Sequence, residues 1–205
     1  MNNIKEMKLY SDAYRIFKDL KALGYSEDDK LSLEDVNQFD QLHYHGTLSV
    51  QEAIETINIQ ENDNVLEVGA GWGGPSRYIA YKTRAHVSAL ELQQDYSDVG
   101  KELTLRTGLQ RFVTHINQDF LNFSQKDLSF NKIVSWLALY HIPYRKTYTD
   151  KLFNLLNKKG MLFIEDLTLG TGFESSHKEI LKKKLFANSL EKYSDYLDLS
   201  LIHIS

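Results

Sequence analysis

Cysteine is absent from the 205 residues. Its absence excludes disulfides, thiolate zinc sites and cysteine nucleophiles together. No stretch of the chain approaches the ~20 consecutive apolar residues that span a bilayer. The first residues also lack the basic and then apolar pattern of a secretory signal. We therefore expect a cytoplasmic protein with no membrane partner.

The sequence has no long block of basic or of acidic residues. The sequence has 24 Lys and Arg against 28 Asp and Glu, a net charge of −4. Its one dense basic run is Lys182–Lys184, too little for the basic surface that binds DNA or RNA. We expect no nucleic-acid partner. Among the seven histidines, His43 and His45 have no obvious third ligand nearby, so we expect no metal.

The N-terminal part of the chain reads as helical. Residues 3–23 carry the apolar period of an amphipathic helix, with Asn3 and Glu6 spaced as a capping box. A second capping-box pattern at residues 49–52 predicts a short helix that ends near Ile57. Because a domain has roughly 150 residues, the length predicts one domain with an appendage.

After residue 57, short apolar runs alternate with longer helical patterns. Alternation of this kind implies parallel strands joined by right-handed crossovers, hence an α/β fold with a doubly wound, mostly parallel sheet. The predicted strands are 65–68, 86–90, 112–116, 132–139 and 161–164, and the predicted helices are 75–82, 94–106 and 145–157. Ligands of such sheets bind beyond the carboxyl ends of the strands. That rule selects residues 67–74, Glu91, Asp119 and residues 135–141.

The segment after Thr168 is less regular. A helix is predicted over residues 179–190, and the apolar residues 199–204 could begin a strand whose partner is absent. We therefore expect a chain truncated at its C-terminus, with the last strands of the domain missing.

A glycine-rich turn follows the first predicted strand of the sheet. Glycine permits positive φ and lets a ligand approach the backbone closely. Gly69, Gly71 and Gly74 satisfy the pattern G-x-G-x-x-G, and Glu91 follows about 20 residues later, where an acidic residue binds ribose hydroxyls. This spacing fits a dinucleotide and S-adenosylmethionine equally, because both carry an adenosine ribose.

Three features favour S-adenosylmethionine over a dinucleotide. Glu67, inside the strand end, would repel a pyrophosphate but suits a ligand that carries an ammonium and a sulfonium. Gly73 adds a further glycine at alternating spacing. Asp119, at the end of the third strand, can accept a hydrogen bond from an adenine amine. A nicotinamide-dependent oxidoreductase remains the alternative enzyme, and an inactive cofactor-binding fragment the non-enzymatic one.

The motifs at residues 65–73, 89–92 and 118–120, followed by the fourth predicted strand, resemble those of class I S-adenosylmethionine-dependent methyltransferases. Residues 39–46 and 71–78 are similar to the sarcosine/dimethylglycine and phosphoethanolamine N-methyltransferases. Trp72-Gly73-Gly74 is also similar to the cyclopropane fatty-acid synthases. The resemblance implies a Rossmann-like methyltransferase domain over residues 58–205, covered by an N-terminal helical lid over residues 1–57.

The resemblance also implies roles for single residues. Glu91 would hold both ribose hydroxyls, and Asp119 would read the adenine edge. The turn at residues 69–71 would approach the methionine part, and residues 135–136 would line the methyl end. The implied cofactor-binding set is Glu67, Gly69, Ala70, Gly71, Gly73, Glu91, Leu92, Asp119, Phe120, Ser135 and Trp136.

The implied reaction moves a methyl group from S-adenosylmethionine to a small-molecule acceptor, an amine nitrogen if the finer resemblance holds. His141 stands where phosphoethanolamine methyltransferases carry a catalytic histidine, and imidazole, with an ordinary pKa of about 6.5, suits proton removal. Tyr44 is the candidate catalytic partner from the N-terminal segment. Leu137 departs from the family pattern, because related enzymes often place there an aspartate that pairs with the substrate ammonium. Either another acid supplies that contact or the acceptor is less cationic.

Overall fold

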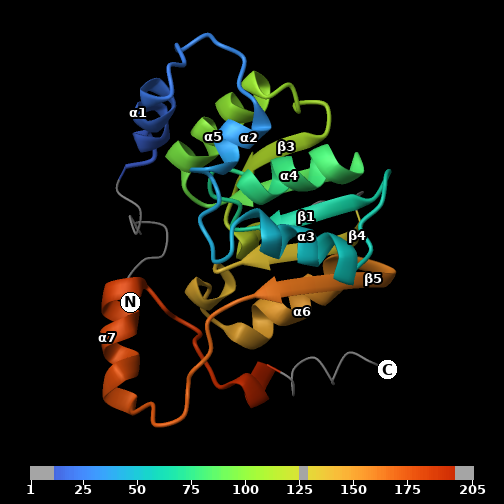
Figure 1. Cartoon of the computed structure of the whole chain (residues 1–205). Helices are drawn as coiled ribbons and strands as arrows, with labels where there is room; N and C mark the ends of the chain where they lie inside the picture. Colours follow the sequence, from blue (N-terminus) through green and yellow to red (C-terminus); the bar gives the residue numbers. More distant parts are fainter. Residues whose placement is uncertain (1–11, 125–128, 197–205) are drawn as a thin grey trace.

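The computed structural model describes residues 12–124 and 129–196. Five parallel strands form one sheet in the order β3-β2-β1-β4-β5 (Figure 1). The strands are β1 (Asn64–Val68), β2 (His86–Glu91), β3 (Val113–Asn117), β4 (Phe130–Trp136) and β5 (Leu156–Glu165). The predicted doubly wound sheet is confirmed. The strand order reverses between β1 and β4, and such a switch point is where a crevice opens in this class of fold.

The helices connect these strands and precede them. They are α1 (Arg15–Ala22), α2 (Leu33–Asn37), α3 (Thr47–Thr56), α4 (Gly74–Thr83), α5 (Gln94–Arg106), α6 (Arg145–Leu155) and α7 (Ser175–Leu185), with 3₁₀ turns η2 (Phe120–Asn122) and η3 (Leu139–His141). The span of α5 is as predicted, and α7 begins and ends earlier than predicted. The predicted capping box at Asn3 and Glu6, like residues 199–204, lies outside the described residues.

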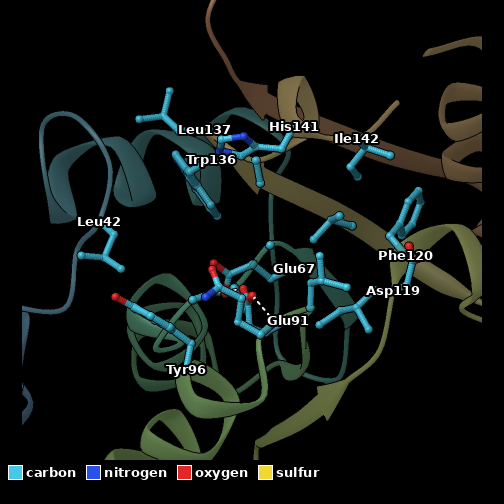
Figure 2. Close-up of a pocket in the computed structure, with 18 of the residues that line it drawn as sticks. Leu42, Glu67, Glu91, Tyr96, Asp119, Phe120, Trp136, Leu137, His141 and Ile142 are labelled. Carbon is cyan, nitrogen blue, oxygen red and sulfur yellow. Dashed lines mark hydrogen bonds between the residues drawn. The ribbon is translucent and has the colours of Figure 1, made fainter. Parts of the chain in front are cut away.

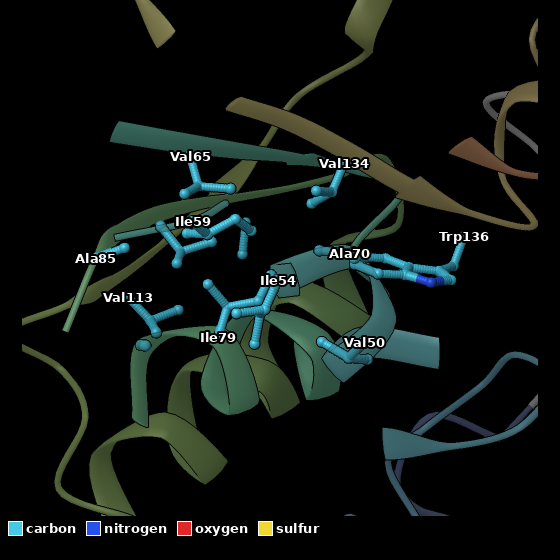
Figure 3. Close-up of a cluster of buried hydrophobic side chains, with 14 of the residues drawn as sticks. Val50, Ile54, Ile59, Val65, Ala70, Ile79, Ala85, Val113, Val134 and Trp136 are labelled. Carbon is cyan, nitrogen blue, oxygen red and sulfur yellow. The ribbon is translucent and has the colours of Figure 1, made fainter. Parts of the chain in front are cut away.

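One face of the sheet packs against α3 and α4 (Figure 3). Val50 of α3 and Ile79 of α4 are fully buried against Val65 of β1 and Val134 of β4. Burial of such side chains contributes ~1.5–3 kcal/mol each. The α3 helix, which falls within the predicted lid, therefore shares the hydrophobic core of the sheet.

The opposite face of the sheet packs against α6. Leu66 of β1 and Ile133 of β4 join Tyr148 and Leu152 of α6 in a second buried cluster. Because side chains alternate along a strand, Leu66 points to the α6 face. The next residue, Glu67, therefore points to the face covered by α4.

The C-terminal part of the described chain leaves the layered body. Figure 1 shows α7 standing apart from the sheet and its helical layers. The chain then returns: Ala187 and Leu190 pack with Tyr140 of η3 and Leu169 in a small buried cluster. No helix in the ranges that the structure describes is long and apolar enough to cross a membrane.

Candidate active site

A cavity opens at the carboxyl ends of β1, β2 and β4, with a volume of about 1030 Å³ when its open mouth is included (Figure 2). The glycine turn after β1, the end of β2, η2 and the segment after β4 all contribute to its wall. Most of the predicted site residues therefore meet in one place. The cavity-lining members of the predicted set are Glu67, Gly69, Ala70, Gly71, Glu91, Leu92, Asp119, Phe120, Trp136 and His141.

The glycine turn lies close to the segment that follows β4. Gly69 and Gly71 have φ values of +77° and +53°, which side-chain-bearing residues rarely adopt. A Cβ on Gly69 would overlap the Cβ of Ala138. The backbone N–H groups of Gly69 and Ala70 both donate to the Leu90 carbonyl, at 2.9 and 3.0 Å. These bonds tie the turn to the end of β2, so the turn is fixed before any ligand binds.

Gly73 is part of the same turn but does not line the cavity, contrary to the prediction. Its φ is +76°, and it forms the N-cap of α4. A Cβ there would meet the His115 ring on β3. Packing between α4 and the His115 side chain of β3 therefore already requires a glycine at this position.

Glu91 anchors the end of β2 to the glycine turn. One carboxylate oxygen accepts the Gly71 N–H and the other accepts the Gln93 N–H, both at 2.8 Å. Burial raises the pKa of Glu91, although the backbone donors oppose the rise. A carboxylate offers about four lone pairs, so each oxygen keeps one for a further donor. Two adjacent hydroxyls, as on a ribose, match that remaining capacity.

Glu67 is a second, more deeply buried carboxyl at the wall of the cavity. Only 2% of its surface is exposed, and it accepts a hydrogen bond from the Ser76 hydroxyl of α4. Burial raises its pKa to about 8, although Ser76 and the Arg77 guanidinium oppose the rise. Glu67 is therefore largely protonated at neutral pH until a cation approaches.

Asp119 lies at the far end of the cavity, next to Phe120 (Figure 2). Its carboxylate accepts the Leu121 N–H at 2.9 Å and caps the 3₁₀ turn η2. The Asn122 side-chain amide donates to its other oxygen at 3.2 Å. The cap fixes both the carboxylate and the backbone of Phe120. The side chains of Leu92 and Leu121 line the same cavity and are apolar.

Trp136 ends β4 and lines the cavity, but its neighbour Ser135 does not. The Ser135 hydroxyl donates to the Val68 carbonyl at 2.9 Å and is buried between β4 and β1. The prediction that Ser135 lines the methyl end is therefore not met. Side chains alternate along β4, so the two residues cannot both face the same side.

A polar network that sequence reasoning missed holds Trp136 in place. The indole N–H donates to the Ser49 hydroxyl of α3 at 2.9 Å, and Ser49 donates to Glu165 at the end of β5. The imidazole of His43 lies 5.5 Å from the Trp136 ring, centre to centre. These contacts join α3, β4 and β5 at one corner of the cavity.

The N-terminal segment reaches the cavity through His43 and not through Tyr44. Tyr44 is 59% exposed and does not line the cavity, contrary to its predicted catalytic role. Asp40, Leu42 and His43 line the wall instead. Burial lowers the pKa of His43, so its ring is mainly neutral at pH 7.

The loop that carries His43 is fastened by a buried ion pair. Asp40 accepts from Arg77 of α4 at 2.8 Å, and both side chains are fully buried. The same guanidinium donates to the Trp72 carbonyl of the glycine turn at 2.7 Å. Asp40 thereby attaches the loop to the turn that forms the floor of the site.

His141 lies on η3, across the cavity from the glycine turn. Its side chain is 6% exposed and lines the cavity. Burial lowers its pKa to about 4, against hydrogen bonds to the backbone of Phe186 and Leu185. The imidazole is therefore neutral at physiological pH, which leaves one ring nitrogen able to accept a proton.

The charges of the cavity wall distinguish between ligand classes. Asp40, Glu67, Glu91 and Asp119 supply carboxyls, and none of the described residues that line the wall is Lys or Arg. Arg77 compensates the charge of Asp40, and Glu67 is largely protonated. Glu91 and Asp119 are therefore the carboxylates that discriminate between ligands by charge. A pyrophosphate would meet them with no Lys or Arg among these wall residues, whereas a ligand with an ammonium and a sulfonium would be attracted. The residues present therefore fit S-adenosylmethionine. No group of acidic or histidine side chains in the described ranges could hold a metal ion.

The five parallel strands, with a ligand cavity at their carboxyl ends, define a Rossmann-like fold of the methyltransferase type. The chain belongs to the mycolic acid cyclopropane synthetase family, whose model matches residues 36–193. This confirms the resemblance inferred from the motifs.

Named relatives are methyltransferases. The chain is 28% identical over 127 residues to a sterol 24-C-methyltransferase of Gibberella zeae, covering 60% of this chain and 33% of that protein. It is 25% identical over 118 residues to a glycine/sarcosine/dimethylglycine N-methyltransferase of Actinopolyspora halophila, covering 58% and 21%. The chain thus spans about a third or less of the length of these two curated relatives.

A solved structure agrees with the fold. Phosphoethanolamine N-methyltransferase 2 of Haemonchus contortus, in complex with S-adenosyl-L-methionine, superposes with a TM-score of 0.77 at 16% identity. The match covers 98% of this chain and 44% of that one.

Proposed function

We propose that this protein transfers a methyl group from S-adenosylmethionine to a small-molecule acceptor, and that the accepting atom is an amine nitrogen. The observation that carries the proposal is Glu91. Its two oxygens are presented side by side by backbone donors from Gly71 and Gln93, in a cavity with acidic walls. Such a carboxylate binds a ribose and is compatible with a cationic nucleoside.

Different residues of the cavity bind different parts of the proposed cofactor. Glu91 binds the ribose hydroxyls, and Asp119 with the Phe120 N–H binds the adenine edge. The turn at residues 69–71 and Glu67 face the methionine part. When bound, the cofactor supplies an activated methyl group on a positively charged sulfur. The amine-methyltransferase relative and the sulfonium-compatible charge of the wall support this arrangement.

The protein's contribution to such a transfer is mainly positioning and exclusion of water. We propose that the loop from Asp40 to His43 acts as the cover of the site, because it lines the cavity and is anchored through Arg77. Trp136 forms the wall at the acceptor end, where its ring can stabilise a cation by ~0.5–2 kcal/mol.

An amine acceptor must lose a proton before its nitrogen can attack. We propose His141 as the base, because it is neutral at pH 7 and lines the same cavity as Trp136. The free imidazole nitrogen would take one proton from the acceptor's ammonium group, and the nitrogen lone pair so released would bond to the methyl carbon. The electrons of the carbon–sulfur bond would stay on sulfur, which would leave as a neutral thioether.

A carbon acceptor is the second candidate, and Leu137 favours it. Leu137 lines the cavity directly after Trp136, with a φ of +51° that is strained for a residue with a side chain. It places an apolar group where an ammonium would need a carboxylate. The named sterol 24-C-methyltransferase methylates, as its name states, at carbon.

Calorimetric titration of the full chain with S-adenosylhomocysteine and with NADH tests the cofactor. Binding of the first and not of the second is expected, and the reverse would make the protein a nicotinamide-dependent enzyme. A screen of amine and alkene acceptors then tests the chemistry. Affinity for S-adenosylhomocysteine with no transfer to any acceptor would identify a cofactor-binding module without activity.

A further inference from the structure

The segment from Phe186 to Leu190, beyond α7, folds back onto the η3 turn that carries His141. The backbone N–H groups of Asn188 and Ser189 donate to the Tyr140 carbonyl at 2.9 and 3.0 Å. The Asn188 side-chain amide donates to the His141 carbonyl at 2.8 Å. About 45 residues of chain separate the two segments, so these bonds are tertiary contacts and not part of a local turn.

The same segment also contacts the imidazole itself. Nδ1 of His141 lies 3.2 Å from the carbonyl oxygen of Phe186. A carbonyl oxygen can only accept, so this contact favours the neutral tautomer with the hydrogen on Nδ1 and the lone pair on Nε2. The backbone of Leu185 is a further hydrogen-bond partner of the ring. The Tyr140 ring lies 3.9 Å from the imidazole, centre to centre, and restricts its rotation.

Asn188 connects the backbone of His141 to the backbone of Phe186. Its side-chain amide donates both to the His141 carbonyl and to the Phe186 carbonyl, the latter at 3.2 Å. Phe186 has a φ of +52°, in the left-handed region that residues with a side chain rarely adopt. The bonds of Asn188 hold that carbonyl in the position that faces the imidazole.

We propose that Asn188 is a positioning residue, which fixes the Nδ1–H tautomer of His141 through the Phe186 carbonyl. Its amide holds the backbone of His141 and the acceptor of its ring proton in one rigid unit. The consequence for catalysis rests on the proposed function, because Nε2 must then be the atom that takes the acceptor's proton. The effect on the tautomer does not depend on that function.

Nitrogen NMR of the full chain distinguishes a protonated from an unprotonated imidazole nitrogen, and His141→Asn assigns the signal. In the wild type, Nε2 of His141 is expected without hydrogen at pH 7. Asn188→Ala is expected to give a mixture of both tautomers. We expect kcat to fall by roughly ten- to a hundredfold, as for other orienting partners of a histidine, with the affinity for S-adenosylhomocysteine unchanged.

Ser189→Ala is the matched control, because the Ser189 hydroxyl bonds the Leu139 and Tyr140 carbonyls of η3 and does not touch His141. It should keep the wild-type tautomer. Asn188→Ser keeps one rotatable hydrogen-bond donor, so it should retain more of the Nδ1–H form than Asn188→Ala. If Asn188→Ala does not fold, Asn188→Ser becomes the test variant.

A wild-type tautomer in the folded Asn188 variants, or an equal tautomer shift in Ser189→Ala, would overturn the proposal. Absence of methyl transfer by the wild type would refute the proposed function alone, because the tautomer measurement needs no turnover.

Discussion

The two sides of the cavity are built in different ways. On the β1–β2–β3 side, Glu91 and Asp119 bond backbone N–H groups within two residues along the chain, and Glu91 also bonds the neighbouring turn. On the β4–β5 side, Trp136 depends on Ser49 and His141 on Phe186, partners that lie 87 and 45 residues away in sequence. The first side consists of short motifs, and the second exists only after distant segments have packed.

The difference matches the chemistry that we propose for each side. A cofactor of fixed structure can be bound by rigid strand ends and turns with local hydrogen bonds. On the acceptor side, Trp136 and His141 are held by a helix, a second strand end and a returning segment, so their positions depend on contacts between distant parts of the chain. We therefore expect substitutions on the first side to alter cofactor binding and substitutions on the second to alter turnover.

The largest difference between the effect on turnover and the effect on cofactor affinity is expected for His141→Ala. Loss of a general base typically lowers the rate by ~10²–10⁴-fold, so turnover should fall by that factor while the affinity for S-adenosylhomocysteine stays unchanged. Steady-state kinetics and calorimetry measure the two quantities. His86→Ala, at an exposed histidine that begins β2, is the control. Unchanged turnover in His141→Ala would make this histidine structural.

Asp40→Ala tests the anchor between the covering loop and the glycine turn. Removal of one partner of a buried ion pair leaves the Arg77 charge without compensation and costs about 3–5 kcal/mol. The free energy of unfolding, from urea denaturation, should fall by that amount. Asp98→Ala removes an exposed pair with Lys101 and should change it by less than about 1 kcal/mol. Equal effects would show that the ion pair does not anchor the loop.

Glu91→Ala should weaken binding of S-adenosylhomocysteine by more than roughly tenfold, because the hydroxyls it binds would be left without a partner. Saturating cofactor should restore most of the turnover, in contrast to His141→Ala. Glu102→Ala, on the exposed side of α5 next to Arg106, controls for loss of a carboxylate. If Glu91→Ala binds S-adenosylhomocysteine as tightly as the wild type and Glu102→Ala do, Glu91 does not bind the ribose.

The smallest effect is expected from pH, through Glu67. Its pKa is about 8 in the free protein, and a cationic ligand favours the ionised form. Binding of S-adenosylmethionine should therefore release a proton, and affinity should rise with pH by at most tenfold per unit until about pH 8, then level off. S-adenosylhomocysteine, which lacks the sulfonium charge, should release less. Calorimetry in buffers of different ionisation enthalpy counts the protons. Glu67→Gln should abolish the difference, and its persistence would assign the proton to another group.

The sheet and the cofactor side were predictable because their signals are local. Each strand is a short apolar run, and the glycine turn, Glu91 and Asp119 follow strand ends at the expected places. Of the short elements, α2 was missed, although Ser32 and Asp35 form a capping contact that a search for N-caps could find. The β5 strand begins at Leu156 and not at Met161: Leu156 already pairs with Phe130 of β4, and the polar residues 157–160 lie at a register shift before pairing resumes at Met161.

The acceptor side was only partly predictable, since no pattern within one segment reports which distant residues it will meet. Ser135 and Trp136 were predicted together, yet strand alternation sends Ser135 into the sheet. The family resemblance predicts a catalytic tyrosine in the N-terminal segment and so points to Tyr44, whereas the fold brings its neighbour His43 to the cavity. The contacts of Ser49, Phe186 and Asn188 carry no local signal at all.

A crystal structure of the complex with S-adenosylhomocysteine tests most directly whether the cavity binds a nucleoside through the carboxylates at the strand ends. We predict the ribose hydroxyls within hydrogen-bond distance of Glu91, the adenine next to Asp119 and Leu92, and the sulfur directed toward Trp136 and His141. A ligand bound elsewhere, or a ribose that does not contact Glu91, would contradict the account.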